Sequence, residues 1–174
     1  MLRYTGSNQR IPEYHAWMCL CLGMGVKTYV ELGVGSSWEQ SHAGMGVVTV
    51  DLLPNGFPHP EEIRHFQGDS HDPAICDAVL NHLQCEPDIV FIDADHSYDG
   101  CRADFNLWYP HARMAVGFHD IRLTEGCDRV WEEVSQQYPS VEIIGRDHAS
   151  AAAWQGTTGD AGRLNAGGIG VIFK

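Results

Sequence analysis

Short apolar runs recur along the chain, and each has the length of a buried β-strand. The clearest is Ile89–Ile92, IVFI, in which every side chain is apolar and most are β-branched. Runs of this kind fit strands buried on both faces, as in a parallel sheet. The same reasoning predicts further strands at 28–32, 47–50, 64–66, 113–118, 141–144 and 169–173.

Segments with helical spacing stand between these strands. Residues 11–25 have a broad apolar face, with Pro12 in the first turn and Gly23 and Gly25 at the end. Further helices are predicted at 73–83, 99–108 and 127–138, and a short one from Ser36 or Ser37 to about residue 43. The pattern predicts an α/β fold with a mostly parallel sheet and helices on both faces.

The stretch DIVFIDADHSYDG, Asp88–Gly100, changes abruptly from apolar residues to acids and imidazole. Asp93, Asp95 and His96 directly follow the strand. Open α/β sheets bind ligands at the carboxyl ends of their strands, so we expect the chemistry here. The alternative is a buried strand followed by an ordinary polar turn.

A second strand end of the same type is His119-Asp120, after the apolar run RMAVGF. If the two strands are neighbours, Asp93, His119 and Asp120 can converge on one ion, since adjacent strands lie about 4.8 Å apart. Two carboxylates and one imidazole suit Mg²⁺ or Mn²⁺ better than Zn²⁺. The alternative is a salt-bridged or capping pair.

A glycine turn follows the first predicted strand. Gly33, Gly35 and Ser36 allow close approach of a ligand to the backbone and the start of a helix. Neither a phosphate loop nor a complete G-x-G-x-x-G is present. Asp51, at the end of the next strand, is placed to accept hydrogen bonds from ribose hydroxyls, although an aspartate in a simple turn is the alternative.

Two segments lack regular patterns. Residues 53–60, LPNGFPHP, contain three prolines and a glycine, and predict either a lid or a connection. Residues 146–168 are polar and rich in glycine and alanine, and predict a long loop. With no internal repeat and no boundary in the pattern, we expect residues 1–174 to form one domain.

Composition narrows the functional classes. The net charge of −12 argues against a nucleic-acid-binding surface, although one or two arginines could still hold a small anion. No apolar run approaches a membrane span and no signal peptide is recognisable, so we expect a cytosolic protein. The six cysteines form no C-x-x-C pair and are expected to be free thiols. Of the ten histidines, only His96 and His119 are distinguished by position.

The order of these motifs resembles that of class I S-adenosylmethionine-dependent methyltransferases. The resemblance rests on VELGVGS at 30–36, VDL at 50–52, GDS at 68–70, FIDADHSY at 91–98 and FHDI at 118–121. The branch it most resembles contains macrocin-type sugar O-methyltransferases and cephalosporin-hydroxylase-like proteins. It implies a Rossmann-like, doubly wound sheet of seven strands with an antiparallel last strand.

The resemblance also implies roles for individual residues. S-adenosylmethionine would be bound by Glu31, Gly33, Gly35, Ser36, Asp51, Leu52, Asp69, Ser70 and Asp93. Asp93, His119 and Asp120 would bind Mg²⁺ or Mn²⁺, and His96 would act with Asp93 in catalysis as the general base. His119 stands where metal-dependent relatives tend to carry a carboxylate, which predicts a lower affinity or a different choice of metal.

We therefore expect a metal-assisted O-methyltransferase that acts on a small hydroxylated acceptor. The acceptor pocket must come from 53–60, 146–168, the N-terminal helix or a second subunit of a homo-oligomer. One alternative is another metal-assisted reaction on the same scaffold, such as hydrolysis or hydroxylation. Another is a non-catalytic nucleoside-binding subunit.

Overall fold

The computed structural model describes residues 11–34, 44–53, 63–122, 125–144 and 167–174. The strands are β1 (Thr28–Leu32), β2 (Gly46–Asp51), β3 (Ile63–Gln67), β4 (Ile89–Ile92), β5 (Ala115–His119), β6 (Ser140–Ile143) and β7 (Ile169–Phe173). The helices are α1 (Ile11–Met24), α2 (Pro73–Leu83), α3 (Tyr98–Trp108), α4 (Glu125–Ser135) and the 3₁₀ turn η1 (Tyr109–His111). Each predicted strand is present, while the predicted short helix after Ser36 lies outside the described residues.

Several element ends differ from the predicted bounds by one to three residues, and hydrogen bonding explains two of these differences. β5 reaches His119 because that residue pairs with Ile169 across the antiparallel ladder. α4 ends at Ser135 rather than near Tyr138, because the N–H groups of Gln137 and Tyr138 both donate to the carbonyl of Val134 in a closing turn.

The strands form one sheet in the order β3-β2-β1-β4-β5-β7-β6. All neighbouring pairs are parallel except β5–β7 and β6–β7, so β7 is the antiparallel strand. The predicted fold class is therefore confirmed. After β1 the chain moves outward to β2 and β3, and then returns to place β4 on the other side of β1. Loops diverge at such a switch point and leave a crevice beyond the strand ends.

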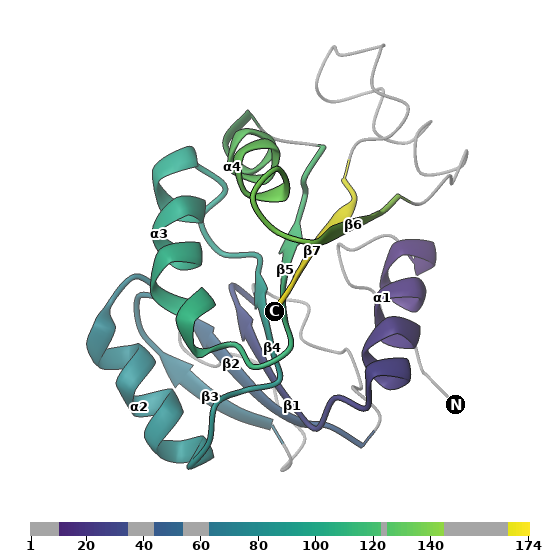
Figure 1. Ribbon diagram of the computed structural model, residues 1–174. Coiled ribbons are helices and arrows are strands. Elements are labelled where there is room, and N and C mark those ends of the chain that lie inside the picture. The colour runs from purple at the N-terminus through teal and green to yellow at the C-terminus, as the bar shows by residue number, and fades with distance from the viewer. Residues whose placement is uncertain (1–10, 35–43, 54–62, 123–124, 145–166) are drawn as a thin grey trace.

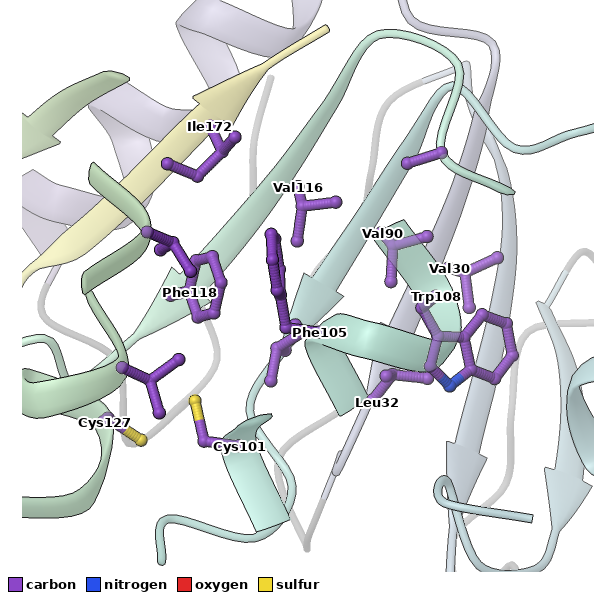
Figure 2. Close-up of a cluster of buried hydrophobic side chains, with 14 of the residues drawn as sticks. Val30, Leu32, Val90, Cys101, Phe105, Trp108, Val116, Phe118, Cys127 and Ile172 are labelled. Atoms are coloured by element: carbon purple, nitrogen blue, oxygen red, sulfur yellow. The ribbon is translucent and has the colours of Figure 1, made fainter. Parts of the chain in front are cut away.

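Both faces of the sheet are covered by helices. α2, α3 and α4 lie on one side, and α1 lies on the other (Figure 1). On the first side, Val30, Val90 and Phe118 of the strands pack against Phe105 and other residues of α3 and α4 (Figure 2). On the α1 side, Trp17 stacks on Phe91 of β4 with ring centroids 5.5 Å apart. Alternating strand residues thus enter two separate cores.

Capping hydrogen bonds at the first turns of α2 and α3 fix the loops that precede these helices. Ser97 caps α3 by accepting a hydrogen bond from the N–H of Gly100 at 3.1 Å, and Asp72 caps α2 through Ala74 at 2.8 Å. The six cysteines are free thiols, as expected. In the described part of the chain, the helices are too short or too polar to cross a membrane.

Candidate functional site

A cavity of about 310 Å³ opens at the carboxyl ends of β1, β2, β3 and β4. Its walls come from the loops that follow these strands. The lining residues are Gly33, Val50, Asp51, Leu52, Gly68, Asp69, Ser70, His71, Ala94 and Asp95. Five residues of the predicted cofactor set, Gly33, Asp51, Leu52, Asp69 and Ser70, thus lie together. The volume lies at the lower end of the range of small-molecule sites.

Gly33 shows why the turn after β1 needs glycine. Its φ is +80°, and a Cβ at this position would come within 2.6 Å of the backbone nitrogen of Ala94. Its own N–H donates to the carbonyl of Val50 at 2.8 Å. A side chain would therefore be strained and would also push apart the loops after β1 and β4. Gly35 and Ser36 lie outside the described residues.

The Asp51 carboxylate lines the cavity and is held by two backbone N–H groups. One carboxylate oxygen accepts from the N–H of Val34 at 2.9 Å, and the other accepts from the N–H of Leu53 at 2.8 Å. A carboxylate oxygen has two lone pairs and can accept more than one hydrogen bond. The neighbouring Leu52 leaves 69% of its surface exposed, which offers an apolar contact beside the carboxylate.

The turn after β3 forms another part of the wall, next to Asp51, whose carbonyl accepts a hydrogen bond from the N–H of Gly68 at 2.9 Å. Asp69 accepts from the N–H of His71 at 2.9 Å, and the Ser70 carbonyl accepts from the Trp108 indole at 2.9 Å. His71 lies between two acids, with Nδ1 3.3 Å from Asp69 and Nε2 3.6 Å from Asp104. Sequence reasoning treated His71 as an ordinary histidine and did not single out Asp104.

The charges around the cavity restrict its ligand. Its lining includes the carboxylates Asp51, Asp69 and Asp95 and the imidazole of His71, with neither lysine nor arginine among the described lining residues. Phosphate groups are normally held by basic side chains or by clustered N–H donors. An acidic cavity instead suits a ligand that offers hydroxyl and amino donors or carries positive charge.

A second cluster lies at the ends of β4 and β5. Asp93, His119 and Asp120 each offer a ligand atom, and these atoms lie within 4.8 Å of one another. His119 Nδ1 is 2.9 Å from Asp93 and 3.6 Å from Asp120. Asp120 adopts φ +54°, an unusual conformation for a residue other than glycine, and such strain is concentrated at functional sites. The predicted convergence is therefore present, and the donor set fits a divalent cation.

His96 connects the carboxylates of this cluster. Its Nε2 is 3.2 Å from Asp93, and its Nδ1 is 3.5 Å from Asp120. The hydrogen bond with Asp93 raises the pKa of His96 to about 9, against the opposing effect of burial. Burial likewise lowers the pKa of His119, but the charge and hydrogen bond of Asp93 outweigh it and raise that pKa to about 9.

Glu31 is a predicted cofactor residue that does not line the cavity. It is 5% exposed, and its position in β1 places it on the same face as Tyr29. Burial, followed by repulsion from Asp93, raises the pKa of Glu31 to about 8. Asp93 is also absent from the cavity lining and belongs to the second cluster.

Comparisons with known proteins bear on this arrangement. No family model matches the chain, and no curated protein sequence matches it significantly. Among solved structures, TomG, an O-methyltransferase from Streptomyces achromogenes in complex with S-adenosylmethionine, has a TM-score of 0.60 at 12% identity, covering 95% of this chain and 81% of its own.

The fold is that of the S-adenosylmethionine-dependent methyltransferases.

Two further structures share this methyltransferase fold. An O-methyltransferase from Bacillus cereus with bound S-adenosylhomocysteine has a TM-score of 0.57 at 14% identity, over 98% of this chain and 84% of its own. The MycE methyltransferase of mycinamycin biosynthesis, in complex with Mg²⁺, S-adenosylhomocysteine and mycinamycin VI, has a TM-score of 0.52 at 20% identity, over 67% of this chain. This chain spans about a third, 36%, of that MycE chain.

Proposed function

We propose that the protein is an S-adenosylmethionine-dependent O-methyltransferase that uses a divalent cation and acts on a small hydroxylated acceptor. The observation that carries the proposal is the pairing of two sites at the switch point. An acidic cavity beside Gly33 and Asp51 lies next to the Asp93–His119–Asp120 cluster. The methyltransferase fold and the ligands of TomG and MycE support this assignment.

The cavity residues account for cofactor binding. Asp51, already fixed by two backbone N–H groups, accepts hydrogen bonds from the ribose hydroxyls. Asp69 and Ser70, in the turn after β3, lie beside the adenine, and Leu52 packs against it. The surrounding carboxylates favour a sulfonium cation and disfavour the phosphates of dinucleotides.

The second cluster provides the proton acceptor. Methyl transfer from a sulfonium is a displacement that needs alignment and the removal of one proton. His96, held between Asp93 and Asp120, takes the hydroxyl proton of the acceptor. A divalent cation bound by Asp93, His119 and Asp120 would compensate the carboxylates, lower the pKa of His96 and orient the acceptor hydroxyl.

The test separates binding from transfer. S-adenosylhomocysteine binding is measured by calorimetry, and transfer of a labelled methyl group is measured on a panel of hydroxylated small molecules with Mg²⁺ or Mn²⁺. Asp51→Asn is expected to weaken binding by about 10- to 100-fold, since hydrogen bonds to a charged group contribute roughly 1.5–3 kcal/mol. His96→Gln is expected to preserve binding but slow transfer by about 10²–10⁴-fold.

Asp77→Asn, at an exposed position on α2, is the matched control and should change neither quantity. Failure of the wild type to bind S-adenosylhomocysteine or S-adenosylmethionine would contradict the proposal. Binding without transfer to any acceptor, and without an effect of His96→Gln, would instead favour a nucleoside-binding subunit.

A further inference from the structure

Asp104 is a fully buried acid on α3. It is 0% exposed and shares the buried face of the helix with Cys101, Phe105 and Trp108. Its carboxylate oxygens make no hydrogen bond of ordinary geometry in the described part of the chain, although the Ser70 hydroxyl lies near enough to favour the ionised form. A buried carboxylate in such surroundings is costly, so its presence on an apolar face calls for a physical reason.

The polar group that faces this carboxylate is His71. Its Nε2 is 3.6 Å from Asp104, and its Nδ1 is 3.3 Å from Asp69. Asp69 and His71 both line the cavity, whereas Asp104 lies behind them. A continuous row of polar side chains, Asp104, His71 and Asp69, therefore runs from α3 to the cavity wall.

The same helix also fixes the neighbouring residue. Trp108, one turn beyond Asp104, donates its indole N–H to the carbonyl of Ser70 at 2.9 Å. α3 thus holds Ser70 through a hydrogen bond and places the Asp104 carboxylate 3.6 Å from the His71 ring. The turn after β3 is positioned by α3 as well as by its own strand.

We propose that Asp104 is a positioning residue for the cofactor: through His71 it orients the ionised Asp69 carboxylate to accept a hydrogen bond from an exocyclic amino group of the bound base. The inference rests on the proposed function and adds a source of base specificity. An ionised carboxylate only accepts hydrogen bonds, so it favours a 6-amino purine over a 6-oxo purine. The charged groups that face Asp104 are His71, Asp69 and Asp95, together with the Ser70 hydroxyl.

The test compares S-adenosylhomocysteine with S-inosylhomocysteine, its 6-oxo analogue, by calorimetry. Asp104→Asn is expected to weaken binding of the amino ligand by roughly 3- to 30-fold and to reduce the preference over the oxo ligand. His71→Gln should have the same two effects. Asp99→Asn, at an exposed position on the same helix, is the control and should have neither.

A pH series provides a readout that a purely structural role would not change. Burial raises the pKa of Asp104 to about 6, with Ser70 and His71 opposing. The affinities of the wild type and of Asp104→Asn should therefore differ at pH 7.5 and converge near pH 5. If Asp104→Asn does not fold, His71→Gln carries the base-preference test.

Two negative outcomes are distinguishable. Wild-type binding with an unchanged base preference in both variants would overturn this inference and leave the proposed function intact. Absence of wild-type binding to S-adenosylhomocysteine and S-adenosylmethionine would overturn the proposed function, and this inference with it.

Discussion

At the scale of the residue, the buried carboxylate of Asp104 lowers the stability of the fold, while its proposed role is to position the cavity wall. Its carboxylate is fully buried, and burial disfavours the ionised form in the folded state. Among the described residues, the Ser70 hydroxyl and the imidazole of His71 at 3.6 Å offset part of this cost. Side chains that reduce stability in this way are characteristic of functional sites.

The stability cost predicts a pH-dependent effect of Asp104→Asn. The pKa of Asp104 is about 6 in the folded state and 3.8 in its ordinary state, so the folded protein gains stability as pH falls through 6. Removal of the charge should therefore stabilise the protein above pH 6, by up to about 3 kcal/mol for a shift of roughly two units. Below about pH 4 this benefit should disappear.

Urea unfolding at pH 4, 5, 6 and 7.5 measures the difference between the wild type and Asp104→Asn. A difference in unfolding free energy that does not vary with pH would contradict the assignment of a buried charge. Asp99→Asn again provides the exposed control on the same helix.

At the scale of the element, α4 supports the loop that carries His96. A Cβ at Gly126, in the first turn of α4, would come within 2.6 Å of the carbonyl carbon of Ser97 and the nitrogen of Tyr98. Cys127 also donates its thiol to the carbonyl of His96 at 3.9 Å. The start of α4 therefore packs directly on the backbone next to the proposed base.

This packing predicts that replacement of glycine by alanine has different effects on stability at Gly126 and at Gly23. Gly126→Ala should lower the unfolding free energy by about 1–3 kcal/mol, because the methyl group overlaps backbone that cannot rotate away. Gly23→Ala in α1 meets nothing within 4 Å and should be neutral or stabilise by up to about 1 kcal/mol through helix propensity. Denaturant unfolding of both variants tests the pair, and equal effects would contradict the packing.

At the scale of the whole molecule, the net charge of the chain and the charge of the cavity lining have the same negative sign. The chain carries a net charge of −12, and its cavity wall bears Asp51, Asp69 and Asp95. S-adenosylmethionine carries one more positive charge than S-adenosylhomocysteine. Its attraction to the protein should therefore be the more strongly screened by salt.

Calorimetry at about 0.02 and 0.5 M NaCl tests this expectation, because the Debye length falls severalfold over that range. The affinity for S-adenosylmethionine should fall more than that for S-adenosylhomocysteine, by roughly two- to fivefold. An equal salt dependence of both ligands would show that the acidic field does not contribute to discrimination between them.

The fold was predictable from local pattern. Runs such as Ile89–Ile92 and the glycine turn at Gly33 depend on burial and on backbone conformation, and both are properties of short segments. The acids at strand ends were recognisable for the same reason. Asp93 and His119 come together because β4 and β5 are parallel neighbours, a condition that the sheet order satisfies.

The contact between Asp104 and His71 was decided by the tertiary structure. Helical periodicity places Asp104 on the buried face of α3, beside Cys101 and Phe105, and this was a usable signal in the sequence. It does not say which residue faces the carboxylate. That depends on how α3 rotates against the sheet and where the turn after β3 lies, and both follow from packing among residues far apart in the chain.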